Sequence, residues 1–192
     1  MFEIEYQYFQ KRFSELPRFK ANGKQYQPFV STDKNRWGLA FPDIFYHISS
    51  ASKVRDCNDS SPIYPCCNTT ALGSCLHLPV KEYTNKTGRM PCPYRAGALH
   101  CVLDILFDLA NGKRDGIQMA ILPYYQGRVT VYIRKRVGPL DYLLVFKMLN
   151  EQTDEHGQFI PLMLITCYPL TYRNMIQIVE GQLKKHRVVL GR

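Results

Sequence analysis

The hydrophobic positions of the C-terminal half change from helical to strand-like spacing along the chain. In the stretch RAGALHCVLDILFDLANGK, apolar residues recur every three or four positions and Asn111-Gly112 follows them. This pattern predicts a helix over about 98–110 that ends at the glycine. A second helical pattern, YRNMIQIVEGQLKKHR, has a basic last turn, and Thr171 is its candidate N-cap.

Between these two helices, four segments show the apolar alternation or continuity of β-strands. They are GIQMAILPYY, GRVTVYIRKR, DYLLVFKML and QFIPLMLITCYP, and short breaks separate them. Strands joined by short breaks usually pair as antiparallel neighbours. The order therefore predicts the α+β class, with a helix packed on a four-stranded antiparallel β-meander over about 117–169.

The N-terminal half lacks this regularity and is predicted to be loop-rich. Phe2, Ile4, Tyr6 and Tyr8 alternate with polar residues, which is typical of an edge strand. The later block RWGLAFPDIFYHI is apolar enough for a short strand or helix. Beyond it, the chain is rich in Ser, Thr, Asn, Pro and Cys up to about residue 95, which predicts long loops.

This contrast predicts the organisation of the chain. Residues 1–95 form a loop-rich N-terminal region that contains a cysteine-rich segment, 57–92, and residues 96–192 form an α+β domain. We expect both to belong to one compact unit, because 192 residues suit a single domain of ordinary size. A long loop in a compact domain indicates an insertion, a lid or a partner surface.

Composition and charge narrow the possible partners. The hydrophobic fraction of 45% supports a folded core, and the net charge of +9 favours a polyanion such as RNA, DNA or an anionic membrane, or an acidic protein. No apolar run reaches the roughly 18 residues of a membrane-spanning helix, so no transmembrane helix is predicted, and we expect RNA rather than a membrane as the partner. The N-terminus, MFEIEYQYFQKRF, lacks a signal-peptide hydrophobic region, which predicts a cytoplasmic protein.

The cysteines do not show metal-ligand spacing. An odd number, seven, without a signal peptide argues against a full disulfide framework. Cys57, Cys66, Cys67 and Cys75 contain no C-x2-C pair, and the adjacent Cys66 and Cys67 cannot easily reach one ion. We therefore predict loop thiols that hold no metal, and no cofactor.

Strand alternation brings chemically active side chains onto common faces. Thr130, Tyr132 and Arg134 share one face of the second strand, and Leu143, Val145 and Lys147 share one face of the third. In the fourth strand Leu162, Leu164, Thr166 and Tyr168 alternate with Met163, Ile165 and Cys167.

One register would gather Arg134, Lys147, Thr166 and Tyr168 at one end of one sheet face. A one-residue slip would reverse it. A structural alternative is that Lys147 is an edge lysine with its ammonium in water and that Thr166 and Tyr168 are ordinary strand formers.

Such a cluster has the groups for cutting RNA without a metal. The 2′-hydroxyl attacks the adjacent phosphate, and the protein supplies a base, an acid and cations for the phosphate oxygens. Arg134 and Lys147 would hold the phosphate, Thr166 would donate a hydrogen bond to it, and Tyr168 would stack on or orient a base. Metal-dependent nucleases need clustered carboxylates instead, and the four strands offer only Asp141, at a turn.

A His-bearing helix, a basic four-stranded meander, DYLLVFK with its lysine and LITCYP with its Thr and Tyr together resemble the barnase–EndoU–colicin–RelE superfamily of small ribonuclease toxins. The resemblance covers about residues 95–173, and the cysteine-rich segment lies outside the family's pattern. It implies a metal-independent endoribonuclease whose partners are RNA and an antitoxin or immunity protein. The family's catalytic His or Arg ahead of the sheet is matched best by His100, with His77 second.

Two other classes of protein remain open. One is a non-catalytic binder: a nucleic-acid-binding, immunity or anti-defence protein, in which Tyr124, Tyr125, Tyr132 and Arg134 would contact single-stranded nucleic acid. The other is a thiol enzyme in which His77 or His100 activates Cys75 or Cys101.

Overall fold

The computed structural model describes most of the chain outside the cysteine-rich segment. The described residues are 2–32, 42–52, 89–91, 95, 99–125, 127–137, 140–170 and 173–190. The helices are α1 (Phe2–Ser14), α2 (Asp43–Ser49), α6 (Leu99–Ala110) and α7 (Arg173–Lys185). The strands are β1 (Phe19–Ala21), β2 (Lys24–Phe29), β3 (Ser50–Ser52), β4 (Arg89–Pro91), β5 (Gln118–Tyr125), β6 (Arg128–Val137), β7 (Leu140–Met148), β8 (Gln152–Asp154) and β9 (Gly157–Pro169).

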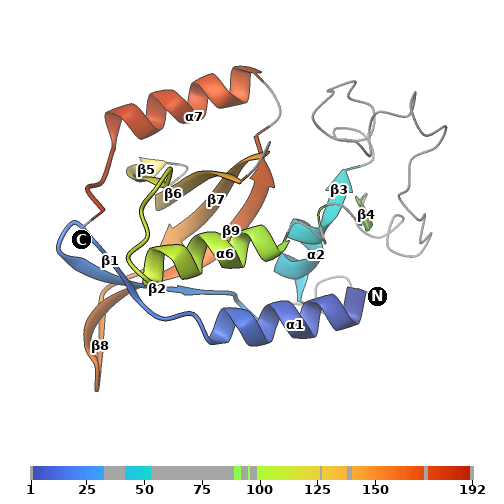
Figure 1. Cartoon of the computed structure of the whole chain (residues 1–192), viewed down its shortest axis with the longest axis horizontal. Coiled ribbons are helices and arrows are strands. Elements are labelled where there is room, and N and C mark those ends of the chain that lie inside the picture. The colour runs from blue at the N-terminus through green and yellow to red at the C-terminus, as the bar shows by residue number, and fades with distance from the viewer. Residues whose placement is uncertain are drawn as a thin grey trace.

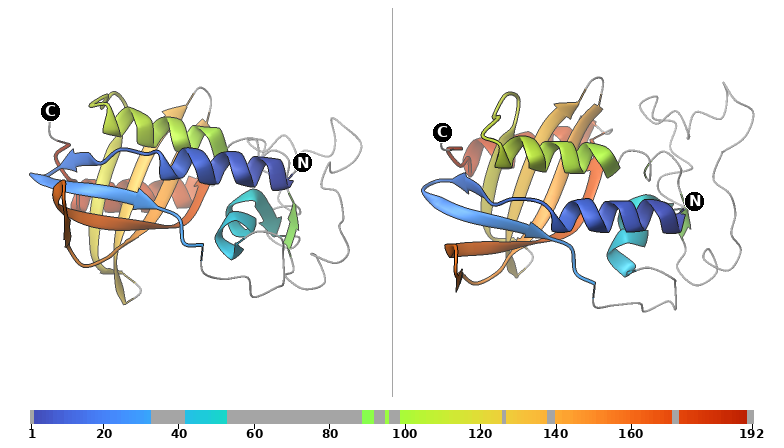
Figure 2. Two further views of the ribbon diagram at one scale, coloured as in Figure 1. Left: turned by 90° about the horizontal axis from the view of Figure 1, so that it is seen from below. Right: turned by 60° about the horizontal axis from the view of Figure 1, so that its bottom comes forward.

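These elements form an α+β fold, as the sequence predicts, in three layers. A curled sheet lies in the middle, α7 covers one of its faces, and α6 covers the other with α1 beside it (Figures 1 and 2). The predicted helix at 98–110 is confirmed as α6.

The sheet is larger than the four-stranded antiparallel meander that the sequence predicts. It has seven strands in the order β1-β2-β9-β7-β6-β5, and β8 pairs with β9 off this path. β5, β6, β7 and β9 pair with antiparallel neighbours, but β2 runs parallel to β9. The signal for β2 was weak because Pro28 lies inside it, and proline normally argues against a strand interior.

The predicted N-terminal edge strand is wrong, because residues 2–14 form the helix α1. The alternating aromatic residues suggested a strand, yet Tyr8 is 57% exposed. The buried positions are Phe9, Phe13 and Leu16, which follow the three-to-four-residue spacing of a helix. The helical period was present in the sequence but overlapped the alternation that precedes it.

The next apolar block contains the short helix α2, whose final turn is supported by serine hydroxyls. Ser49 Oγ donates a hydrogen bond to the Phe45 carbonyl at 2.7 Å, and Ser50 Oγ donates to the Tyr46 carbonyl at 2.5 Å. The strand β3 follows and pairs antiparallel with β4, which lies near the end of the cysteine-rich segment 57–92. Cys57, Cys66, Cys67 and Cys75 lie outside the described residues, as does the candidate N-cap Thr171.

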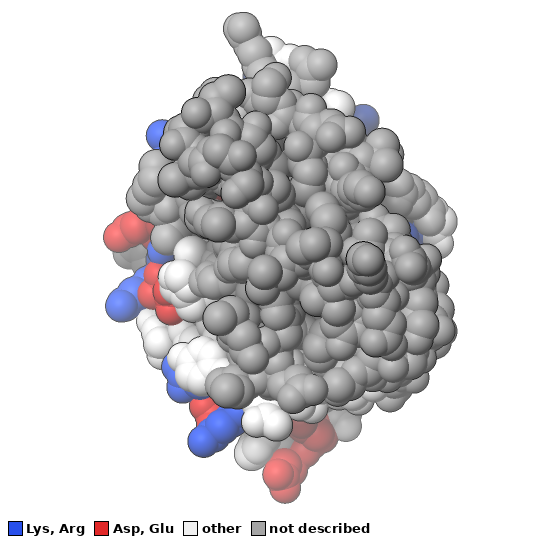
Figure 3. Space-filling model, turned by 90° about the vertical axis from the view of Figure 1, so that its right-hand side faces the viewer, with Lys and Arg blue, Asp and Glu red and all other residues white. Residues whose placement is uncertain are grey.

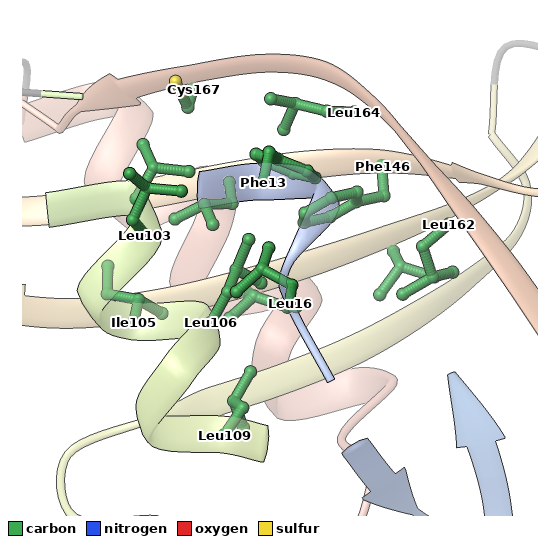
Figure 4. Packing of buried hydrophobic residues seen from close by; sticks show 14 of the residues in the cluster. Phe13, Leu16, Leu103, Ile105, Leu106, Leu109, Phe146, Leu162, Leu164 and Cys167 are labelled. Atoms are coloured by element: carbon green, nitrogen blue, oxygen red, sulfur yellow. The ribbon is translucent and has the colours of Figure 1, made fainter. Parts of the chain in front are cut away.

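The main hydrophobic core lies between α6, α1 and one face of the sheet. Leu103, Ile105, Leu106 and Leu109 extend from α6 towards side chains of β7 and β9, and α1 with the residues after it adds two more (Figure 4). The sheet residues seen there are Phe146, Leu162, Leu164 and Cys167, and the other two are Phe13 of α1 and Leu16 just after it. Burying one such large apolar side chain contributes roughly 1.5–3 kcal/mol, so this layer fixes α6 on the sheet. Because α1 and β2 contribute to the same cluster, the first thirty or so residues are part of this core.

A β-bulge in β9 changes the predicted alternation of that strand. Phe146 pairs with Leu164, but its neighbour Val145 pairs with Thr166, so Ile165 is an extra residue. Before the bulge the even-numbered residues belong to the main core, whereas Thr166 faces the same side as Val145. The strand can therefore bury its leucines under α6 and still present Thr166 on the α7 side.

The residues after α7 connect the two ends of the curled sheet. The Val188 amide donates a hydrogen bond to the Met119 carbonyl on β5 at 2.9 Å. The Val189 carbonyl accepts one from the Asn22 amide, in the turn between β1 and β2, also at 2.9 Å. β5 and β1 are the first and last strands of the sheet order, so this C-terminal tail links both edges (Figure 1).

Candidate nucleic-acid interface

The strand register places the four predicted sheet residues on one face, the face that α7 covers. Cross-strand partners point to the same side of a sheet. Thr130 pairs with Lys147, Val145 pairs with Thr166, and Leu143 pairs with both Arg134 and Tyr168. The bulge is what allows Thr166 and Tyr168 to share this face with Lys147.

The four side chains do not meet at one point on that face. Arg134 lies opposite Leu143, four positions along β7 from Lys147, which corresponds to about 13 Å at the usual rise of a strand. Along β9, Thr166 lies between the levels of these two cations, and Tyr168 is level with Arg134. Lys147 and Thr166 are close diagonal neighbours, whereas Arg134 belongs to the opposite end of the face.

α7 covers the central part of this face and leaves the Lys147 end outside its contacts. The cluster beneath α7 contains Leu143 and Val179, with Tyr132, Val145 and Tyr168 packed against it. Arg128, Lys147, Met163 and Thr166 are half-buried, and Met163, the apolar residue among them, is not a member of that cluster. We call these four residues, together with the buried Thr130 between them, the open strip.

Two cations lie close together on the open strip. Arg128 is two residues before Thr130 on β6, and Thr130 pairs with Lys147, so the two cations are diagonal cross-strand neighbours about 7–8 Å apart at their Cα atoms. Within the described part of the chain, neither one takes part in an ion pair, and the sheet positions that surround them on this face carry no carboxylate. Many other cations have an acidic partner, such as Lys24 with Glu151 at 3.5 Å.

Arg128 was not among the residues predicted from the sequence. The signal was present, because the alternation in GRVTVYIRKR places Arg128 on the same face as Thr130, Tyr132 and Arg134. Arg128 lies beside the turn at Gly127, where an arginine is usually a solvated charge.

Two carboxylates hold Arg134 through two of its three guanidinium nitrogens. Its Nε donates a hydrogen bond to Asp141 Oδ1 at 2.8 Å, and its Nη2 donates to Asp141 Oδ2 at 2.5 Å and to Glu180 Oε1 at 3.3 Å. The hydrogen bonds to Asp141 raise the pKa of Arg134 above its ordinary value, against the opposing effect of burial. This bidentate pair joins β6 to β7 and fixes the direction of the guanidinium.

The candidate proton carriers do not join this face. His100 lies on α6, on the opposite side of the sheet, where its side chain is exposed. His77 lies outside the described residues. His100 therefore does not bring a base to Lys147 in the way that metal-free RNA cleavage needs.

His100 and Cys101, at the start of α6, do not form an activated thiol. His100 Nε2 lies 3.6 Å from Cys101 Sγ, but the Cys101 side chain is buried. Burial, and secondly the charge of Asp104, raise the pKa of Cys101 above its usual value, which opposes formation of the thiolate. Cys75, the other candidate, lies outside the described residues.

The tyrosines predicted to contact a nucleic acid do not all lie on this face's open strip. Tyr132 and Tyr168 are half-buried at the edge of the cluster beneath α7. The backbones of Tyr124 and Tyr125 lie in β5, and their side chains lie outside the described ones. Two tyrosines therefore flank the open strip on its α7 side.

Charges of both signs occur elsewhere on the surface. Figure 3 shows one side of the molecule, and Lys or Arg lies next to Asp or Glu along its described margin. The described residues contain no group of three His, Cys, Asp or Glu side chains that could hold a metal ion. None of the described helices is both long and apolar enough to cross a bilayer.

Comparisons with known proteins give no function for the chain, so a proposal depends on the geometry described above. A scan against protein-family models, a search of the curated proteins and a search of the solved structures each return no match for the chain.

Proposed function

We propose that the protein binds single-stranded RNA through the open strip and does not cleave it. The observation that supports this most is the pair of cations, Arg128 and Lys147, on one sheet face without a carboxylate on the neighbouring strand positions. Cations that no acidic group neutralises attract phosphates and release bound counterions on binding. The net charge of +9 strengthens the attraction at long range.

A single strand fits this surface better than a duplex. Thr166 offers a hydroxyl to a phosphate or a ribose. Tyr132, diagonal to Lys147, and Tyr168, two residues beyond Thr166 on β9, offer partly exposed rings. Unstacked bases can lie on aromatic side chains of a sheet while the backbone follows the basic positions. Bases within a duplex are already stacked on one another and cannot use the tyrosines.

Binding without cleavage follows from the separation of the groups that cleavage needs. Arg134 is neutralised by Asp141, and His100 lies on the other side of the sheet. A metal-free ribonuclease needs a base, an acid and cations around one phosphate. Lys147 and Thr166 alone provide a binding surface.

The test measures RNA binding by fluorescence anisotropy with a labelled single-stranded oligoribonucleotide. We expect Lys147→Ala and Arg128→Ala each to weaken binding on the order of fivefold, and each to reduce the slope of log Kobs against log salt by about 0.7. Lys113→Ala is the matched control, because it removes the same charge from a side chain that is 73% exposed at the end of α6.

The same samples decide between the binder and the nuclease. Incubating the labelled RNA with wild-type protein in EDTA should leave it intact. Cleavage that Lys147→Ala and Thr166→Ala abolish would replace this proposal with the metal-free ribonuclease. Equal losses of affinity in Lys147→Ala and Lys113→Ala would show a non-specific charge effect and exclude the open strip.

A further inference from the structure

A second group of basic residues lies at the C-terminal end of α7, and it shares no residue with the open strip. A cavity of about 350 Å³ opens between the last turns of α7 and the edge of the sheet. We call it the α7 groove. Its lining residues are Gln118, Arg134, Glu180, Leu183, Lys184 and Arg187.

Arg134 enters this groove with its direction already fixed. Nε and Nη2 hold Asp141 and Glu180, so the guanidinium is pre-organised by two carboxylates. Within the described residues, Nη1 makes no hydrogen bond to another group. A guanidinium that is locked through one edge and has donors left over is suited to an additional anionic ligand, because little side-chain entropy remains to be lost.

The other two cations are held by the elements that carry them. Lys184 follows Leu183, a residue of α7 whose buried side chain packs against the sheet and fixes that turn of the helix. Arg187 lies in the C-terminal tail between two backbone hydrogen bonds to β5. They join the His186 carbonyl to the Ile121 amide at 3.2 Å and the Val188 amide to the Met119 carbonyl at 2.9 Å. Both cations are exposed, and neither has an ion-pair partner among the described residues.

The charges around the groove favour an anion, although two features oppose one. Three lining side chains are cationic and one, Glu180, is anionic, and Asp141 neutralises part of Arg134 from outside the lining. This leaves a formal excess of one positive charge. The carbonyl end of α7 contributes roughly half a negative charge, which reduces the excess without cancelling it.

We propose that the α7 groove binds the phosphate group of a small molecule. Arg187 and Lys184 contact the phosphate oxygens, Nη1 of Arg134 donates to a third, and Gln118 can hydrogen-bond to the remainder of the ligand. The volume lies at the lower end of the roughly 300–1,000 Å³ typical of small-ligand pockets, which suits a mononucleotide or free phosphate. The site is independent of the open strip and of RNA binding there.

A substitution of Glu180 tests the proposal through the direction in which phosphate affinity changes. Its carboxylate is 55% exposed and lies 3.3 Å from Arg134, so it competes with the ligand for the same guanidinium. Glu180→Gln removes that negative charge from the groove while Asp141 still holds Arg134. Binding of a phosphate should therefore become tighter, by about threefold or more, in this variant.

The experiment is isothermal titration of the full chain at low salt with inorganic phosphate, with adenosine 5′-monophosphate and with uncharged adenosine. We expect both phosphates to bind and adenosine alone not to bind. Lys184→Ala and Arg187→Ala should each weaken phosphate binding about tenfold. Lys185→Ala is the control, because it removes the same charge from the adjacent position, which does not line the groove. Glu155→Gln, on the exposed turn before β9, is the corresponding control for Glu180→Gln.

The outcomes separate the sources of the phosphate and decide the proposal. Equal affinity for the two phosphates indicates free phosphate, and tighter binding of the monophosphate indicates a nucleotide; both support the α7 groove. The proposal is overturned if wild-type protein binds neither, if Lys185→Ala loses as much affinity as Lys184→Ala, or if Glu180→Gln binds no more tightly than Glu155→Gln. Circular dichroism of each variant establishes that it is folded, and if Arg187→Ala is not, the Lys184 and Glu180 comparisons decide.

Discussion

Cys167 is a titratable group that the protein shields almost completely from water. It lies on β9 in the main core, on the side that faces α6 (Figure 4), and only 1% of it is exposed. Burial is the main cause that raises the pKa of its thiol to about 12. The thiol is therefore neutral in the folded protein at physiological pH and unsuited to nucleophilic chemistry.

This shift predicts an alkaline loss of stability. Below about pH 8.5 the thiol is protonated in both states, so its contribution is fully present. Between there and about pH 12 the folded state keeps a proton that the unfolded state releases, so stability falls by about 1.4 kcal/mol per pH unit. Urea unfolding at several pH values from about 8 to 10 should show a less steep decline for Cys167→Ala than for wild type. Parallel declines would contradict the assignment.

Arg134 shows why a residue's role is hard to predict from its type. The sequence places it on the α7-facing side of β6 with Lys147, and the register agrees. Its acidic partners are seven and 46 positions away in the sequence, and the nearer one, Asp141, lies in what looked like an ordinary turn. Alternation along a strand predicts which face a side chain takes, but it does not predict which distant side chain neutralises it.

At the scale of elements, a few residues of the C-terminal tail join the two edges of the sheet. Val188 and Val189 are adjacent and chemically identical, but 8% of Val188 is exposed and 74% of Val189. Val188 packs in the main core while its amide pairs with β5. The stability of the tail should therefore depend on one valine and not on the other.

The matched pair tests this role. Val188→Ala removes buried methyl groups and should lower the free energy of unfolding by about 1–2 kcal/mol, whereas Val189→Ala should change it by less than about 0.5 kcal/mol. Chemical denaturation of both variants measures the difference. Equal effects would mean that the tail does not hold the sheet through Val188.

The element pattern also explains which helices and strands the sequence could predict. α6 and α7 have one apolar face each and clear end signals, so periodicity is enough to identify them. α1 was misread because its first apolar residues alternate, and β2 was missed because Pro28 and polar residues obscure its pattern. Both elements owe their conformation to packing against α6 and β9, which local patterns do not contain.

At the scale of the whole molecule, the class of fold was predictable and the layout of the sheet was not. The parallel pairing of β2 with β9 joins residues about 130 positions apart, and the single extra residue Ile165 decides which face Thr166 takes. Neither feature leaves a local signal. The candidate site was therefore predicted as a face but not as a cluster, and the open strip is the part of that face that α7 leaves outside its contacts.

Chemical-shift mapping tests most directly whether the open strip contacts RNA. A titration of ¹⁵N-labelled protein with single-stranded RNA should shift the backbone amides of Arg128, Thr130, Lys147 and Thr166, with smaller shifts in α1 and α6 on the other side of the sheet. Shifts centred on His100 and α6, or no shifts at any RNA concentration, would contradict that contact.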